Sequence, residues 1–264
     1  MKCAVLGDPI AHSLSPVLHR AGYAATGLDW EYDAVQVAAR GLADYVDGRD
    51  GDWRGLSVTM PLKREALEYA GAASDVARLA GVANTLVNDG DNVYAENTDV
   101  PGAAAAIRER YDGPLDSAVI LGGGATAISV GLALAELGCA DLTLLARSPD
   151  RAAEAAFTIG QTAGNVSVRA LGQGLPRADI VVSTIPAAAQ TPDLVAASAR
   201  VPVIFDVLYH PWPTPLAASA SDRILVSGLD LLAHQAMLQF ELFTGREVDV
   251  EVLRAAGKAA LAAN

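Results

Sequence analysis

The amino-acid sequence predicts an α/β protein of two domains, each built on a sheet covered by helices. Strand-like and helix-like segments alternate along the chain, which favours parallel strands connected through helices. Pro101-Gly102 and the turn at 112–114 interrupt this alternation, and a fresh strand begins at residue 117. We therefore expect residues 1–100 to form the first domain and residues 101–235 the second, with C-terminal helices at about 236–264 returning to the first.

In the first domain, short apolar runs bounded by turn residues predict strands at 2–6, 30–35 and 55–59. Helical patterns cover residues 16–26, 38–49 and 61–69, and Pro61 is expected at the first position of its helix. Residues 83–88 and 92–95 predict a hairpin across Asp89-Gly90-Asp91.

The second domain is expected to begin with an alanine-rich helix at 101–111 and to carry a further helix at 128–137. Its apolar runs predict six strands, at 117–121, 142–146, 166–170, 179–184, 203–207 and 223–226. Strands that alternate with helical segments in this way indicate a parallel, doubly wound sheet.

Composition excludes several classes of protein. The chain has 264 residues, of which 52% are hydrophobic, and charges or turn residues interrupt every apolar stretch before about 18 residues accumulate, so we expect no membrane span and no secretory signal. A net charge of -12 argues against a nucleic-acid or anionic-membrane partner. Cys3 and Cys139 are expected to be buried thiols in a reducing cytoplasm. The four histidines lack metal-ligand spacing, so no metal site is expected.

A glycine-rich turn lies between a predicted strand and a predicted helix. Gly122, Gly123 and Gly124 lead into Ala125-Thr126-Ala127 and the helix beyond. Gly122 would make the tight turn, Gly124 would admit a pyrophosphate, and Ala127 would let helix and strand pack closely. With the positive end of the helix beside it, the segment predicts a Rossmann-type dinucleotide site rather than an ordinary loop.

The end of the next strand indicates which dinucleotide binds. Arg147, Ser148 and Arg151 follow that strand, where an NAD site would carry an acidic residue; Asp141 precedes the strand and so lies at the wrong end. Two guanidinium groups and a hydroxyl suit the 2′-phosphate of NADP, although a solvated loop with incidental arginines is the alternative.

Polar residues recur in the first domain where packing does not require them. Ser13 and Ser15 precede a helix, and either could be an N-cap or a ligand for a polyhydroxylated molecule. Ser57 and Thr59 share one face of an extended segment, and Lys63 lies in the first turn of the following helix.

Lysine is rare in this chain, which has only Lys2, Lys63 and Lys258. A lysine near a helix N-terminus is electrostatically disfavoured, and unlike arginine it can give up a proton. Lys63 is therefore the best candidate for acid–base chemistry, with an exposed helix lysine as the alternative. Asn84 and Asp99 complete the pattern, and Asp99 could hold the Lys63 ammonium or simply cap a helix.

These motifs together resemble the shikimate dehydrogenase family in order and spacing. The residues concerned are Gly7-Asp8-Pro9-Ile10, His12-Ser13-Leu14-Ser15-Pro16, Ser57-Val58-Thr59-Met60-Pro61-Leu62-Lys63, Val82-Ala83-Asn84-Thr85-Leu86, Asn97-Thr98-Asp99, the Gly122 turn, Asp206-Val207-Leu208-Tyr209, Pro213-Thr214-Pro215-Leu216 and Gly228-Leu229 through His234-Gln235-Ala236. The resemblance spans essentially the whole chain and is specific as a combination.

The resemblance implies an N-terminal substrate domain, a Rossmann-type NADP domain and an active site in the cleft between them, where 3-dehydroshikimate is reduced to shikimate on the route to chorismate and the aromatic amino acids. It implies Lys63 and Asp99 as the catalytic pair. The implied substrate-binding residues are Ser13, Ser15, Thr59, Lys63, Asn84, Asp99, Tyr209 and Gln235. The implied cofactor-binding residues are Gly122, Gly123, Gly124, Ala125, Thr126, Ala127, Arg147, Ser148, Arg151, Thr184 and Gly228.

Three departures from the family pattern stand out. Ser57 replaces a frequent asparagine, Ala146 replaces an asparagine before the first cofactor arginine, and residues 183–186 replace a more polar stretch near the nicotinamide. None removes a group that the chemistry requires.

Several alternatives remain open. A quinate or aminoshikimate dehydrogenase would share the scaffold, a methylene-tetrahydrofolate dehydrogenase would also pair two such domains, and a non-catalytic NADP-sensing module would use only the second domain. We expect a small-molecule substrate, no nucleic-acid or membrane partner, and a monomer or homodimer.

Overall fold

The computed structural model describes residues 1–49, 51–90 and 92–263. The chain divides into two compact units, the first made of Met1–Thr98 and Leu232–Asn264 and the second of Asp99–Leu231. Helix α10 (Gly228–Thr244) contributes its first residues to the second unit and the remainder to the first. Each unit holds one six-stranded sheet.

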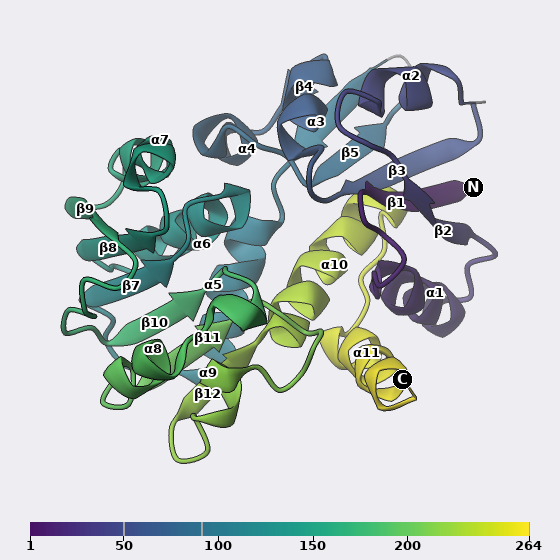
Figure 1. The fold of residues 1–264 in the computed structure, drawn as a ribbon. Coiled ribbons are helices and arrows are strands. Elements are labelled where there is room, and N and C mark those ends of the chain that lie inside the picture. Colours follow the sequence, from purple (N-terminus) through teal and green to yellow (C-terminus); the bar gives the residue numbers. More distant parts are fainter. Residues whose placement is uncertain (50, 91, 264) are drawn as a thin grey trace. The chain divides into compact units, whose positions relative to one another are not determined.

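The first unit is a mixed sheet of order β2-β1-β3-β5-β6-β4 (Figure 1). Its strands are β1 (Lys2–Gly7), β2 (Glu31–Gln36), β3 (Trp53–Val58), β4 (Ala72–Ala73), β5 (Thr85–Asn88) and β6 (Val93–Glu96). Strand β1 runs parallel to both β2 and β3, whereas β5 is antiparallel to β3 and β6. The hairpin of β5 and β6 is as the sequence predicts, and Asp91 of its turn lies outside the described residues.

The helices of the first unit are α1 (Ser15–Thr26), α2 (Leu42–Asp47), α3 (Lys63–Tyr69), α4 (Asp75–Ala80), the later part of α10, and α11 (Val250–Ala262). Two expectations about them are wrong. The helix expected at 38–49 forms only as α2, because residues 38–41 make a turn in which Arg40 has φ 69. Pro61 does not begin a helix, since α3 starts at Lys63 after a tight turn in which Leu62 N–H donates to the Thr59 carbonyl.

The C-terminal helices complete the core of the first unit. A Cβ on Gly55 of β3 would lie 2.1 Å from the Phe243 ring of α10, and a Cβ on Gly22 of α1 would lie 2.8 Å from Phe240. Only glycine allows approaches this close. Residues 188 and 218 positions apart in sequence therefore pack as one body, which fixes α10 against β3 and α1.

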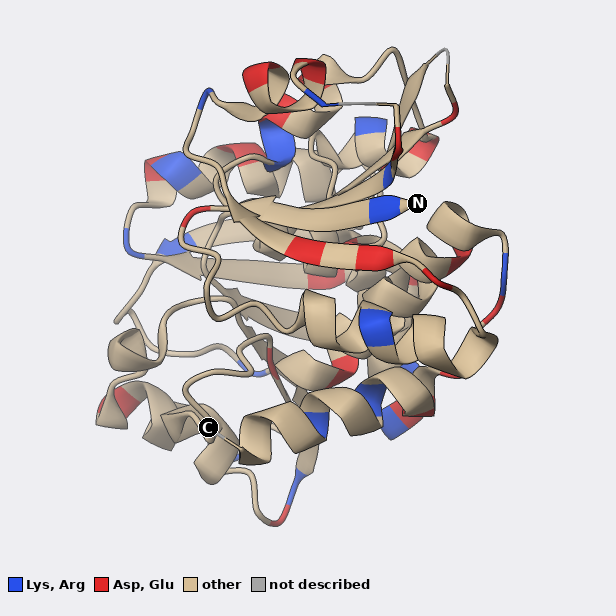
Figure 2. Ribbon diagram, turned by 90° about the vertical axis from the view of Figure 1, so that its right-hand side faces the viewer, with Lys and Arg blue, Asp and Glu red and all other residues tan. Residues whose placement is uncertain are grey.

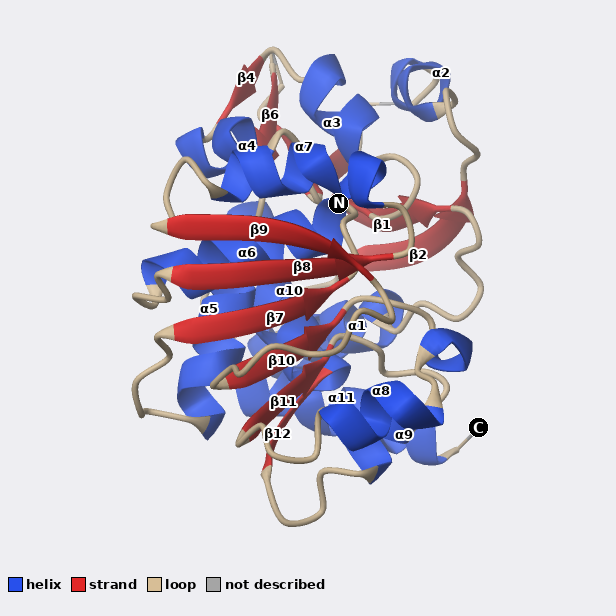
Figure 3. Ribbon diagram, turned by 60° about the vertical axis from the view of Figure 1, so that its left-hand side comes forward, coloured by secondary structure: helices blue, strands red, loops and turns tan. Residues whose placement is uncertain are grey.

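The second unit is an all-parallel sheet of order β12-β11-β10-β7-β8-β9, which Figure 3 shows strand by strand. The strands are β7 (Ser117–Leu121), β8 (Asp141–Ala146), β9 (Asn165–Ala170), β10 (Ile180–Ser183), β11 (Val203–Asp206) and β12 (Ile224–Ser227). All six were expected, within a few residues.

Helices cover both faces of the second sheet. They are α5 (Asp99–Arg110), α6 (Ala125–Glu136), α7 (Pro149–Ile159), α8 (Pro192–Ala197) and α9 (Pro215–Ala218), with a short 3₁₀ turn at Ala187–Ala189. Val119 and Leu121 belong to a core cluster with Leu216 of α9, whereas the intervening Ile120 lies under Gly131 of α6. The chain starts in the middle of the sheet at β7, proceeds outward through β8 and β9, and returns to β10 on the other side. This is the doubly wound order whose switch point, between β7 and β10, is the usual place for a ligand.

The charges of both units are dispersed. In the view of Figure 2, segments of Lys and Arg are separated from one another and interspersed with acidic ones. Across the described part of the chain, no helix combines the length and apolarity that crossing a bilayer demands. Cys3 and Cys139 are both buried and free, as expected.

Candidate functional site

The glycine turn lies at the switch point of the second sheet. Gly122 has φ 115, and a Cβ there would lie 2.3 Å from the Thr184 Oγ1 at the end of β10. Thr184 in turn donates its hydroxyl to the Leu121 carbonyl at 2.8 Å. A residue with a side chain at 122 would therefore be strained and would also collide with Thr184, so the sequence requirement for glycine has two physical causes.

The rest of the turn leaves the start of α6 accessible. Gly123 packs on α7, where its Cβ would lie 2.6 Å from that of Ala152, while nothing lies within 4 Å of the Gly124 position. No side chain caps α6 and no acidic residue occupies its first turn. The N-terminal end of α6 can therefore receive an anion at its backbone N–H groups.

A cavity of about 460 Å³ opens beside this turn in the second unit. It is lined by Gly122, Gly123, Gly124, Ala146, Arg147, Ser148, Arg151, Ala152, Leu171, Ile185, Pro186 and Ala189. The lining thus combines glycine backbone, apolar side chains and two arginines. No ion pair joins either guanidinium to a carboxylate within the described ranges, and both side chains are exposed. Such a cavity fits a dinucleotide that carries a phosphate on its adenosine ribose.

Six of the predicted cofactor residues line this cavity: the three glycines, Arg147, Ser148 and Arg151. The other five do not. Ala125, Thr126 and Ala127 form the first turn of α6, and Ala127 is fully buried, which suits the packing role expected from the sequence. Thr184 packs against Gly122 and donates its hydroxyl to the preceding Leu121 carbonyl. Gly228 begins α10, where a Cβ would lie 2.2 Å from the Val207 carbonyl oxygen.

In the first unit, a buried polar cluster surrounds Asn84. Its Oδ1 accepts from the Thr98 N–H at 2.8 Å, and its Nδ2 donates to Thr98 Oγ1 at 2.9 Å and to Gln235 Oε1 at 3.4 Å. Gln235 is oriented by its own Nε2, which donates to the Leu232 carbonyl at 2.9 Å. Sequence reasoning named Asn84 and Gln235, and the structure brings them together although they are 151 residues apart.

Lys63 and Thr59 adjoin this cluster through the backbone. The Lys63 carbonyl accepts from the Ala83 N–H at 2.9 Å, and the Asn84 carbonyl accepts from the Val58 N–H at 2.7 Å. Lys63 is the first residue of α3, and Asp99 directly follows Thr98 as the first residue of α5. The Asp99 side chain is buried.

Ser13 and Ser15 do not cap α1. Its N-cap residue is Leu14, without a side-chain cap, and Ser13 Oγ accepts from the Ser15 N–H at 3.3 Å. The capping alternative is therefore wrong for both serines.

Tyr209 lies in the second unit on a segment anchored by Asp206 at the end of β11. The Asp206 carboxylate accepts from Thr214 Oγ1 at 2.6 Å, from Gln190 Nε2 at 2.7 Å and from the Leu208 N–H at 3.1 Å. Burial raises the pKa of this carboxyl, and the three hydrogen bonds oppose that rise. Sequence reasoning saw Asp206 only as part of a motif. Its structural role is to hold both ends of the segment that carries Tyr209.

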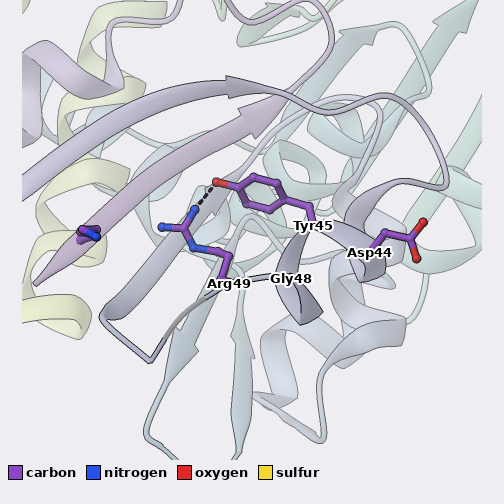
Figure 4. Close-up of a pocket in the computed structure, with 5 residues that line it drawn as sticks. Asp44, Tyr45, Gly48 and Arg49 are labelled. Carbon is purple, nitrogen blue, oxygen red and sulfur yellow. Dashed lines mark hydrogen bonds between the residues drawn. The ribbon is translucent and has the colours of Figure 1, made fainter.

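A second hollow, of about 450 Å³, lies in the first unit between β1 and α2 and is lined by Lys2, Asp44, Tyr45, Gly48 and Arg49. Figure 4 shows the Arg49 guanidinium directed at the Tyr45 hydroxyl, to which it donates, and Asp44 pointing away from the pair. None of the predicted site residues lines it, so it is separate from the candidate site.

Comparison with known proteins agrees with these features. A family model described as the shikimate dehydrogenase substrate binding domain matches residues 5–86, and one described as the shikimate 5'-dehydrogenase C-terminal domain matches residues 228–256. A curated shikimate dehydrogenase (NADP(+)) from Caulobacter vibrioides is 38% identical over 265 residues, which cover 94% of this chain and 93% of the relative. The chain belongs to the shikimate dehydrogenase family.

Solved structures of the family superimpose closely. The Mycobacterium tuberculosis shikimate dehydrogenase matches with a TM-score of 0.89 and 40% identity, covering 98% of this chain and 99% of that one. The Thermus thermophilus shikimate 5-dehydrogenase, solved in complex with NADP(H) and shikimate, matches with a TM-score of 0.86 and 27% identity, covering 98% of this chain and 99% of that one. The predicted fold class, with its Rossmann-type sheet, is confirmed.

Proposed function

We propose that this chain catalyses the reversible NADPH-dependent reduction of 3-dehydroshikimate to shikimate, with Lys63 and Asp99 as the catalytic pair. The first unit binds the substrate and the second binds NADP(H). The observation that carries the proposal is the cluster around Asn84, which adjoins Lys63 through Ala83 and holds Thr98, the residue before Asp99. This cluster supplies hydrogen bonds of the kind that a polyhydroxylated carboxylate requires.

Bound NADPH supplies the hydride that goes to the ketone carbon. The Lys63 ammonium gives a proton to the ketone oxygen, or stabilises the alkoxide that forms there. Asp99 holds that ammonium and accepts from a substrate hydroxyl. The remaining substrate ligands are Ser13, Ser15, Thr59, Asn84, Tyr209 and Gln235, which take the carboxylate and the other hydroxyls.

In the second unit the glycine turn and the start of α6 hold the pyrophosphate, and Arg147, Ser148 and Arg151 hold the 2′-phosphate. Ala125, Thr126 and Ala127 form the first turn of the helix that would hold the pyrophosphate, while Thr184 and Gly228 would contribute by shaping the backbone of the cofactor site. Because Cys3 and Cys139 are free thiols, a reducing cytoplasm is the compartment we propose.

Substituting both Arg147 and Arg151 with alanine should raise KM for NADP about 100-fold and leave turnover with NAD almost unchanged. Each arginine can supply a charge-assisted hydrogen bond to the 2′-phosphate, worth about 1.5–3 kcal/mol, and NAD lacks that phosphate. Steady-state kinetics with both cofactors measure the effect. Arg177→Ala is the matched control, since Arg177 is exposed at the start of β10, at the opposite end of that strand from the cavity. An equal loss with NAD would contradict the phosphate assignment.

The direct test of the activity is shikimate oxidation, followed by the absorbance of the reduced nicotinamide, with quinate and NAD in parallel reactions. We expect turnover with shikimate and NADP. Turnover only with quinate or with NAD would replace the specificity while retaining the catalytic pair. No turnover in any of the four reactions, together with NADP binding, would favour the non-catalytic sensor.

A further inference from the structure

Asn84 is held from inside the first unit by Gln239 of α10, a residue that the proposed mechanism does not use. Gln239 is 1% exposed. Its Nε2 donates to the Asn84 carbonyl at 3.0 Å and to Thr85 Oγ1 at 2.8 Å. A carbonyl oxygen can only accept, so the Gln239 amide must present its nitrogen to Asn84 and its oxygen to the other side.

On that other side lies Ser57, whose hydroxyl donates to Gln239 Oε1 at 2.6 Å. Because this uses the single hydroxyl hydrogen of Ser57, the Tyr32 hydroxyl has to donate to Ser57 Oγ. The Tyr32 ring is stacked on His19, with centroids 4.2 Å apart and planes at 10°. Burial raises the pKa of Tyr32 and lowers that of His19 to about 3, so both stay neutral at ordinary pH and the donor direction does not change.

The chain of hydrogen bonds continues to the Asn84 side chain. Thr85 Oγ1 accepts from Gln239 and therefore gives its own hydrogen to Asn84 Oδ1, at 2.8 Å. With Oδ1 taken by Thr85 and by the Thr98 N–H, the Nδ2 group faces Thr98 Oγ1 and Gln235. Every donor and acceptor from Tyr32 to Asn84 thus has one possible direction, and the series fixes which end of the Asn84 amide faces the candidate site.

We propose that Tyr32, Ser57 and Gln239 are positioning residues that orient Asn84 for substrate binding, and that the Ser57 hydroxyl is a structural donor rather than a substrate ligand. The inference rests on the proposed role of Asn84. It gives the serine at position 57 a role, because Ser57 is 4% exposed and its only hydroxyl hydrogen is committed to Gln239.

The test is Gln239→Met, which keeps the side-chain length but removes both amide functions. We expect KM for shikimate to rise about tenfold, with KM for NADP unchanged, because a buried group left without its partner loses the fixed orientation. The same substitution in an Asn84→Ala background should give no further rise in KM for shikimate, because the residue it positions is then absent.

Tyr32→Phe is the milder second variant, since it removes one hydroxyl at the far end of the series and should raise KM for shikimate two- to threefold. Its matched control is Tyr23→Phe, which removes a buried hydroxyl from the same aromatic cluster without touching the series. The control should leave KM unchanged.

Three results would overturn the proposal: an unchanged KM in Gln239→Met, an equal rise from that substitution with and without Asn84, or identical effects of the two tyrosine variants. If Asn84→Ala alone leaves KM for shikimate unchanged, the positioning proposal is also wrong, although the activity stands. Failure of the proposed activity is distinct, because the unaltered chain would then not oxidise shikimate at all.

Discussion

Replacing Lys63 with alanine is expected to lower kcat for shikimate oxidation by about 10²–10⁴-fold, the range usual for loss of a general acid or base. In the proposed mechanism the ammonium handles the proton at the ketone oxygen, so its removal should act on the transition state more than on ground-state binding. KM for NADP should stay within about twofold, because the cofactor cavity is formed wholly by residues of the second unit.

The small number of lysines makes the control simple. Lys258→Ala removes an exposed lysine from α11 and should leave kcat unchanged. Lys63→Arg keeps the positive charge but cannot release a proton, so it separates proton transfer from electrostatic stabilisation. A Lys63→Ala enzyme with near-normal kcat would exclude this residue from the chemistry.

Strands such as β7 and β10 were predictable because they are short apolar runs bounded by turn residues, and burial on both sheet faces requires that pattern. The two-residue strand β4 was not predicted, because it is too short to give a pattern. The helix expected at 38–49 was too long. A helical pattern there runs through Gly41, and the alternative turn at Arg40 is stabilised by Glu65 of α3, which accepts from the Arg40 N–H at 2.7 Å. That contact is tertiary and has no local signal. The helix expected from Pro61 starts two residues later for a similar reason. The Thr59–Leu62 turn is held to β1 by the Thr59 N–H, which donates to the Leu6 carbonyl at 2.9 Å.

The candidate site was predictable wherever function requires an unusual residue in a fixed local context. Gly122 between a strand and a helix is such a case. A lysine at the start of a helix in a lysine-poor chain is unusual in the same way, and the role of Lys63 stays a prediction. The buried residues that hold the candidate site residues in place were not predictable. Ser57 and Gln239 are 182 residues apart, and a buried glutamine on an apolar helix gives no indication of its partner. The role of Asp206 was not predictable either. Its hydrogen bonds to Gln190 and Thr214 join separate loops, and a tertiary contact of this kind has no local signal in the sequence.

Replacing Asp99 with asparagine is expected to lower kcat/KM for shikimate by about 100-fold. Asparagine has the same shape but no charge. In the proposed mechanism it would therefore not hold the Lys63 ammonium as a carboxylate would, and its amide would present a donor where the substrate hydroxyl needs an acceptor. A buried hydrogen bond to a charged group is worth about 1.5–3 kcal/mol, and two such interactions are weakened together.

Because Asp99 starts α5, its carboxylate also lies at the positive end of that helix, and its substitution could act through stability alone. Thermal unfolding of the variant separates the two effects, and Glu109→Gln, an exposed acid-to-amide change at the far end of the same helix, is the matched control. We expect Asp99→Asn to lose activity while staying folded at assay temperature, and to lose it equally at saturating NADP. If the loss instead followed the fall in Tm, Asp99 would be a helix-terminal residue and Lys63 would act without a carboxylate partner at this position.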